Sequence, residues 1–323
     1  HTNSKEKMTQ QILTKIWQKA KVSREQVDTA KDGQIINGCL ILLKNKYDDK
    51  AFKQRQDVKY VAAKNLAVVS RLMFTNCVNL ELIYAPNVEK IEDGYVNEAD
   101  EGFGGFSGAQ ITDICFPKLL YAGDLSFFDC QKAVTVDLPL CEEVAKYGFE
   151  LCTSVKVMFL PRLKTIGVRS FNRCSSMTEL VIPAATSVGD SCVSGCVTLK
   201  SINCPLTAAL FKCDRMDCTT CPVCSDEIGI CLLRGKNLLM DAIDQIREHD
   251  RQMTQTVAQQ KQEIQTLKTQ MQNLDTQHQQ QITTLYYQIL NLQQQHQYEM
   301  AALKQQNERR DEQMRGQMDQ MKG

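Results

Sequence analysis

The sequence is poor in the features that mark several large classes of protein. It has four histidines, one tryptophan and a formal net charge of zero. A neutral chain lacks the basic surface of a protein that coats nucleic acid, so we expect no nucleic-acid partner. The longest strongly apolar run, Cys39 to Leu43, is far shorter than the ~20 residues of a membrane-spanning helix, so we expect no membrane span.

Neither the histidines nor the glycine-rich stretch of the sequence forms a known catalytic or phosphate-binding motif. His1 is terminal, whereas His249, His278 and His296 lie in a segment that we predict to be one long helix. None of them accompanies a nucleophile in a globular pocket. The glycine-rich stretch 102–108 lacks the Lys-Ser/Thr pair of a phosphate-binding loop. We therefore predict that the chain is not an enzyme, with no catalytic and no cofactor-binding residues.

The N-terminus lacks the apolar core of a secretion signal. Residues 1–7 are polar, and they either precede a native start at Met8 or belong to the natural chain. Without a signal, the simplest compartment is the cytoplasm. The fifteen cysteines would then be mostly reduced thiols.

What the sequence does contain is a repeat. Six of its seven prolines follow one another at intervals of 31, 22, 22, 22 and 22 residues, namely Pro86, Pro117, Pro139, Pro161, Pro183 and Pro205. Other residues recur at fixed distances from these prolines. In most units a phenylalanine lies twelve residues before the proline, a cysteine nine before it and an apolar residue three before it. A further unit without proline fits around Lys64, which gives about seven repeats over residues 51–210. The long interval contains an acidic, glycine-rich insertion at 92–105, expected to be an edge loop.

Each unit is too short to bury its own apolar residues, so neighbouring units must stack into one continuous core. Alternation just before the proline, as in Leu180-Val181-Ile182, predicts a short strand that the proline ends. The Phe-x-x-Cys part is predicted to form the opposite wall as a tight helical turn. Five cysteines then form a column of small buried side chains, with a row of metal ligands as the alternative: Cys77, Cys130, Cys152, Cys174 and Cys196.

The repeat resembles a known family. The segment Phe171-Asn-Arg-Cys174-Ser-Ser-Met177-Thr-Glu-Leu180-Val-Ile-Pro183, followed by Val188-Gly189, is similar to the BspA-like (Treponema-type) leucine-rich repeat. The segment from Phe149 to Pro161 carries the same pattern, and the resemblance covers roughly residues 51–210. It implies an α/β repeat fold, a leucine-rich-repeat solenoid with short parallel strands. Such repeats abound in protists and some bacteria, where they serve as recognition surfaces and are often adhesive when secreted.

The strand alternation also predicts a binding face. Residues three and one before each proline would point inward, and those four and two before it would point outward. The outward set is Cys115 together with the candidate protein-binding residues Leu82, Tyr84, Asp113, Thr135, Asp137, Val157, Phe159, Glu179, Val181, Ser201 and Asn203. Val157, Phe159 and Val181 would form an exposed apolar patch, which is typical of protein contacts. Simple cross-strand packing is the alternative.

A second group of cysteines follows the repeats: Cys213, Cys218, Cys221, Cys224 and Cys231. Two Cys-x-x-Cys pairs share Cys221, whereas a usual zinc site has two separate pairs. We predict that residues 211–235 form a Cys-rich C-terminal cap with free or opportunistically paired thiols. Zinc bound by these cysteines, redox chemistry and an iron–sulfur cluster are the alternatives.

The first 50 residues are predicted to form an N-terminal helical cap. Apolar residues at helical spacing indicate a helix over residues 5–20, a second short helix fits 23–30, and residues 35–43 resemble a buried strand. Together they would cover the N-terminal end of the solenoid. A docking helix centred on Trp17 is the alternative.

Residues 236–323 contain no proline and are predicted to form a long α-helical coiled coil. The apolar seam, with heptad spacing and one stutter, is Ile243, Ile246, Met253, Val257, Ile264, Leu267, Met271, Leu274, Ile282, Leu285, Ile289 and Leu292. Pairing would give either a homo-oligomer or a coil with another protein. A glutamine-rich disordered tail is the alternative.

These features predict a protein–protein interaction scaffold, with the repeats as recognition surface and the coil for oligomerisation. A structural or cytoskeleton-associated coiled-coil protein and a surface adhesin are the alternatives. An enzyme would require zinc in the cysteine group after the repeats.

Overall fold

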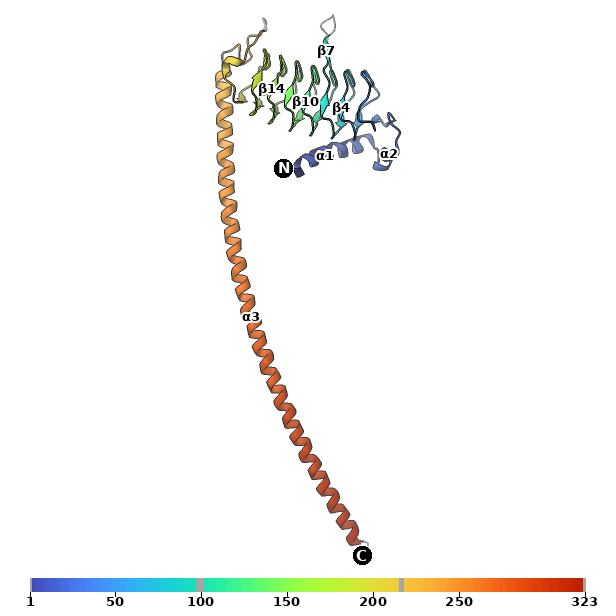
Figure 1. Ribbon diagram of the computed structural model, residues 1–323, viewed down its shortest axis with the longest axis vertical. Helices are drawn as coiled ribbons and strands as arrows, with labels where there is room; N and C mark the ends of the chain where they lie inside the picture. Colours follow the sequence, from blue (N-terminus) through green and yellow to red (C-terminus); the bar gives the residue numbers. More distant parts are fainter. Residues whose placement is uncertain (1, 97–101, 215–217, 322–323) are drawn as a thin grey trace. The chain divides into compact units, whose positions relative to one another are not determined.

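The computed structural model describes residues 2–96, 102–214 and 218–321 (Figure 1). It divides into two units, residues 1–243 and 244–323. The first unit contains a solenoid of stacked coils, and the second is the greater part of one long helix. No helix in the described part of the chain is both long and apolar enough to cross a membrane.

One wall of the solenoid is built from three-residue strands, as the alternation before the prolines predicts. They pair in parallel within two stacks. The first stack contains β2 (Cys39–Ile41), β3 (Tyr60–Ala62), β5 (Leu82–Tyr84), β9 (Asp113–Cys115) and β11 (Thr135–Asp137). The second contains β13 (Val157–Phe159), β15 (Glu179–Val181) and β17 (Ser201–Asn203). The central residue of each of these strands, from Leu40 of β2 to Ile202 of β17, packs in the core.

A second wall, which the sequence analysis did not predict, is a parallel sheet of two-residue strands. It contains β4 (Val68–Val69), β6 (Lys90–Ile91), β10 (Tyr121–Ala122), β12 (Glu143–Val144), β14 (Thr165–Ile166) and β16 (Ser187–Val188). Each strand follows the proline position and contributes one inward aliphatic residue, such as Val144 or Ile166. Strands of two residues are too short to show alternation, so only the stacking of coils defines them.

The third wall consists of consecutive turns, so the predicted helical turn at Phe-x-x-Cys is wrong. In most of the described coils two non-glycine residues take the left-handed conformation, as Tyr147 (φ 59°) and Leu151 (φ 63°) do, and in the last coil Ser191 shares this role with Gly195. This conformation turns their N–H groups toward the next coil: Tyr147 donates to the carbonyl of Val168 at 3.0 Å and Leu151 to that of Asn172 at 2.9 Å. A helical turn would direct these donors along its own axis and leave the coils unbonded.

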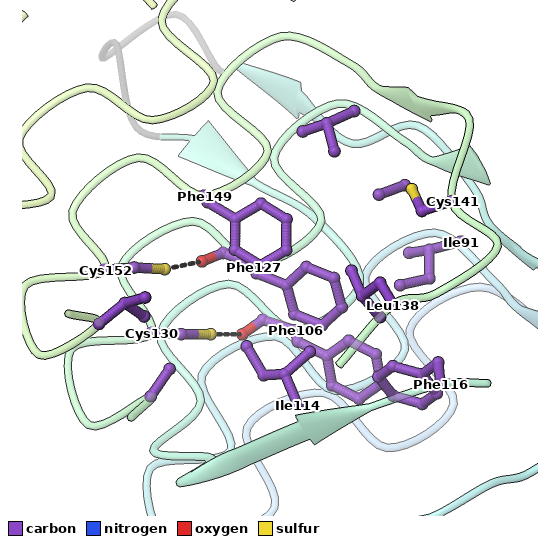
Figure 2. Packing of buried hydrophobic residues seen from close by; sticks show 14 of the residues in the cluster. Ile91, Phe106, Ile114, Phe116, Phe127, Cys130, Leu138, Cys141, Phe149 and Cys152 are labelled. Atoms are coloured by element: carbon purple, nitrogen blue, oxygen red, sulfur yellow. Dashed lines mark hydrogen bonds between the residues drawn. The ribbon is translucent and has the colours of Figure 1, made fainter. Parts of the chain in front are cut away.

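A ladder of phenyl rings fills the core beside this wall (Figure 2). Successive ring centroids lie 4.8–6.0 Å apart along the ladder Phe52, Phe74, Phe106, Phe127, Phe149 and Phe171. Phe106 stands eleven residues before Pro117 rather than twelve, so the regular spacing missed it. The rings and the inward aliphatic residues form one apolar cluster that runs from Leu40 to Cys231.

The insertion is a hairpin at an edge of the solenoid. Strands β7 (Tyr95–Val96) and β8 (Gly102–Phe103) pair antiparallel, and the rings of Tyr95 and Phe103 lie 6.0 Å apart. The predicted edge loop at 92–105 therefore contains a short two-stranded element. The segment 97–101 between the strands lies outside the described residues.

The N-terminal segment contains α1 (Thr2–Ala20), α2 (Arg24–Thr29) and β1 (Ile35–Ile36). Both predicted helices are present, but the single strand predicted at 35–43 is a hairpin in which β1 pairs antiparallel with β2. Its turn residues, Asn37 and Gly38, have φ of 49° and 79°, as a type I′ hairpin turn requires. Strand β2 pairs with β3 and extends the sheet beyond the first full repeat.

The other end of the solenoid meets the first turns of α3 (Ile228–Met321), which follows the 3₁₀ turn η1 (Ala208–Leu210). The Asn203 amide donates a hydrogen bond to the carbonyl of Gly235 at 3.2 Å. A Cβ atom on Gly235 would lie 2.2 Å from the carbonyl oxygen of Ile202, so only glycine allows the helix this close to β17. The start of α3 therefore caps the last coil.

Candidate protein-binding surface

Helix α1 covers part of the face on which the strands were predicted to bind a partner (Figure 1). Its apolar residues Ile12, Ile16 and Ala20 pack in one cluster with outward residues of β3, β5 and β9. Leu82 and Cys115 are each only 1% exposed as a result. Two ion pairs border this contact, Lys15 to Asp113 at 3.4 Å and Lys19 to Glu81 at 2.9 Å. The helix was predicted to cover the end of the solenoid; the structure places it across the strand face.

The predicted outward residues thus differ in accessibility. Leu82, beneath α1, and Ser201, near α3, are buried. Tyr84, Asp113, Thr135, Asp137, Glu179, Val181 and Asn203 are half-buried. Val157 and Phe159 are exposed by 45% and 54%. Only the middle of the face, around β13, presents large apolar side chains to solvent.

The register that places these two residues outward follows from their neighbours. Met158, between them, is fully buried, and Leu180 and Ile202 continue its inward row on β15 and β17. Val157 pairs with Glu179, and Phe159 pairs with Val181. The exposed apolar surface is therefore Val157 and Phe159 with Val181 beside them, and we call it the β13 patch.

A groove adjoins the strand face on the side of α3. Its volume is about 370 Å³, and it lies between the starts of β15 and β17 and the first turns of the helix. Its lining residues are Thr178, Glu179, Lys200, Ser201, Arg234, Asn237, Leu238 and Asp241. Glu179 and Ser201 are among the predicted binding residues, whereas the helix residues are not, because nothing in their spacing shows that α3 reaches the strands.

The cysteine column is a set of hydrogen-bond donors as well as a set of small buried side chains. Each thiol contacts the carbonyl oxygen of the phenylalanine one coil earlier, at 3.1–3.3 Å; two of these bonds are drawn in Figure 2. Burial raises the pKa of the thiols of Cys130, Cys152 and Cys196 far above their ordinary range. These groups stay protonated and act as donors.

Four of the five cysteines after the repeats converge. The sulfurs of Cys213, Cys218, Cys221 and Cys224 all lie within 4.8 Å of one another. Cys231, the fifth zinc candidate, lies elsewhere: it is buried in the core and its thiol contacts the carbonyl of Leu199 at 3.5 Å. Burial opposes ionisation of Cys218, but hydrogen bonds from the backbone of Cys221 and from neighbouring thiols lower its pKa to about 6.

Comparison with known proteins supports the repeat assignment. Residues 102–213 match the BspA type leucine rich repeat region in six copies. A search of the curated proteins found no match for this sequence.

Two solved structures are similar to the chain at 18% identity each. A leucine-rich repeat protein from Bacteroides ovatus ATCC 8483 matches 51% of this chain and 47% of its own, with a TM-score of 0.36. A leucine rich repeat protein from T. pallidum matches 47% of this chain and 60% of its own, with a TM-score of 0.31. The match thus spans about half the length of each of these proteins.

Proposed function

Since residues 102–213 are a BspA-type leucine-rich repeat region, we propose that this chain is a protein-binding scaffold that recognises a partner protein on its strand face and self-associates through α3. Leucine-rich repeats generally mediate contacts between proteins. A reducing compartment such as the cytoplasm would suit its many thiols.

One observation carries the recognition part of the proposal. The strand face already binds an amphipathic helix, because α1 buries Leu82 and Cys115 on it. The β13 patch continues the same face beyond the strands that α1 contacts, and its apolar side chains remain accessible. Glu179 pairs with Val157 of the patch, and Asp137 ends the strand β11 that neighbours β13, so two acidic residues border the patch as a polar rim. An apolar centre with a polar rim is the usual composition of a protein interface.

The second unit supports the self-association part. Helix α3 is 94 residues long, which corresponds to about 140 Å at 1.5 Å per residue. Its seam residues in this unit, from Ile246 to Leu292, are exposed in the single chain. An isolated helix with an apolar seam gains free energy when that seam is buried against another helix.

Recognition can be tested with Phe159→Asp in the full chain, used as bait in its native cell. Because the ring points to solvent, the variant should fold with an unchanged circular dichroism spectrum and lose its specific partners. Val197→Asp is the matched control, since Val197 is similarly exposed (51%) in a turn of the third wall. Partners retained by Phe159→Asp, or lost equally by both variants, would refute the strand-face proposal.

Self-association can be tested by sedimentation of the full chain. Leu267→Lys with Leu274→Lys places two charges in the seam and should convert the oligomer into a monomer. Thr269→Lys with Thr276→Lys adds the same charge two residues farther along, away from the seam, and should leave the oligomer intact. A wild-type chain that is monomeric at micromolar concentration would contradict self-association and favour a helix from another protein.

The length of α3 favours a second function, that of an elongated structural component in which the repeats form a terminal domain. The two variant sets distinguish it from the first. A structural role would be lost with the seam variants and retained with Phe159→Asp.

A further inference from the structure

We propose that Cys213, Cys218, Cys221 and Cys224 bind one Zn²⁺ ion through four thiolates, at the junction between the last coil and α3. This inference is independent of the proposed function, because it concerns how the end of the solenoid is built.

The distances fit a single metal ion. The four sulfurs lie within 4.8 Å of one another. Tetrahedral zinc with Zn–S bonds of about 2.3 Å requires sulfurs about 3.8 Å apart. Side-chain rotations that move the sulfurs by about 1 Å would therefore close the site. An iron–sulfur cluster holds its cysteine sulfurs farther apart, because the inorganic core lies between them.

The backbone around Cys221 and Cys224 is already folded. After Cys221 the chain makes a tight turn in which the N–H of Ser225 bonds the carbonyl of Cys221 at 3.0 Å and that of Glu227 bonds Pro222 at 2.8 Å. This turn places Cys221 and Cys224 on the same side, immediately before α3 begins at Ile228. The Cys-x-x-Cys pair therefore has the compact shape of a zinc-binding knuckle.

The sulfurs also lie beside backbone outside this turn. The backbone of Gly195, in the last coil, lies next to the thiols of Cys218 and Cys221. Polar backbone groups beside the sulfurs help to orient the ligands of a metal site. This proximity also places the thiol group at the turn wall, next to Cys196 of the column.

Sequence spacing alone argued against zinc because two Cys-x-x-Cys pairs share Cys221. The structure shows how four ligands still arise: Cys213, which follows η1, brings a fourth sulfur to those of Cys218, Cys221 and Cys224. A metal ion here would tie the chain leaving the last coil to the turn that starts α3. Four soft thiolate ligands favour zinc among the common metals.

The test uses the full chain, expressed with added zinc and purified under reducing conditions. Mass spectrometry of the metal content should find one zinc per chain. Cys218→Ser and Cys221→Ser should lower this to background, whereas Cys231→Ser and Cys204→Ser, which remove thiols outside the group, should leave one zinc. Replacing zinc by Co²⁺ should give the intense visible bands of a tetrahedral tetrathiolate.

A second measurement does not depend on the variants folding. Titrating the wild-type protein with a thiol-modifying reagent should release one zinc as four thiols react, while the buried column stays unmodified. Three results would overturn the proposal. They are less than a tenth of an equivalent of bound zinc after incubation with excess Zn²⁺, bound iron instead of zinc, and two disulfides among these four cysteines. Zinc that is retained in both Cys218→Ser and Cys221→Ser would overturn it as well.

Discussion

The thiol of Cys152 donates a hydrogen bond to the carbonyl oxygen of Phe127, one coil earlier, across 3.3 Å (Figure 2). Its neighbours along the column repeat this relationship, as Cys174 does with Phe149 at 3.2 Å. The same phenylalanines stack their rings in the core. Cysteine suits this position because it is small enough for the narrow wall and still supplies a donor.

Replacing one column cysteine should therefore destabilise the solenoid. Cys152→Ala removes both the donor and the sulfur, and we expect the free energy of unfolding to fall by about 1–2 kcal/mol. Urea denaturation followed by circular dichroism measures this. Cys204→Ala is the control, because Cys204 is only half-buried and its thiol makes a longer contact, 3.9 Å, with the carbonyl oxygen of Leu206. If both variants lose the same free energy of unfolding, the hydrogen bond from Cys152 to Phe127 contributes nothing to stability.

Stability should also fall at alkaline pH through the buried thiols. Burial raises the pKa of Cys77 from 9.0 to about 11. The folded state then holds a proton that the unfolded state releases, so this contribution is complete below pH 9 and is lost as the pH rises toward 11. Between pH 9 and 11 the free energy of unfolding should fall more steeply in the wild type than in Cys77→Val, by about 1 kcal/mol per pH unit. Parallel slopes would exclude this titration.

The contact between α1 and the strand face can be tested at Ile16. This side chain is fully buried against the outward face of the strands. Ile16→Ala should cost about 2–5 kcal/mol if the whole unit unfolds together, and less if α1 detaches alone. Hydrogen exchange distinguishes the two, since detachment would raise exchange in α1 and leave β5 protected. Gln18→Ala on the exposed side of the helix should change neither quantity.

Two glycines of α3 provide a matched pair. Gly235→Ala would place its Cβ 2.2 Å from the carbonyl oxygen of Ile202, so we expect it to push the helix off the last coil at a cost of about 1–3 kcal/mol. Gly229→Ala meets no atom within 4 Å and should be neutral or stabilise by up to about 1 kcal/mol. Thermal unfolding of both variants checks the pair. A similar rise in both midpoints would contradict the close contact at β17.

Most features that recur in every coil could be predicted from the sequence. Proline spacing identified the coils, and alternation placed Met158 inward and Phe159 outward, because a three-residue strand has only two faces. The predictions were less accurate where a contact joins distant segments. Helix α1 was predicted from its apolar side, but that side could not show whether it covers an end or a face. The Asn37-Gly38 pair is typical of a hairpin turn, but the apolar residues on both sides of it led to the prediction of one continuous strand.

The candidate site could be predicted from the sequence only in part. The β13 patch follows from strand register alone, so its residues could be read from the sequence. The groove beside α3 and the convergence of Cys213 with Cys221 depend on how the chain turns after the last coil. Two-residue strands and left-handed turns carry little local signal, since neighbouring coils and not side-chain propensities hold them in place.

The left-handed residues of the turn wall have a consequence for how the protein folds. Positions such as Asp129 (φ 58°) and Arg173 (φ 56°) adopt a conformation that costs an isolated L-residue about 1 kcal/mol or more. A hydrogen bond to the next coil compensates this cost at each position. The N–H of Asp129 donates to the carbonyl of Glu150 at 2.8 Å, and that of Arg173 donates to the carbonyl of Ser194 at 2.7 Å. A single coil lacks that compensation. Folding should therefore need a nucleus of several adjacent coils before each added coil becomes favourable, and shortened versions should lose their structure abruptly rather than one coil at a time.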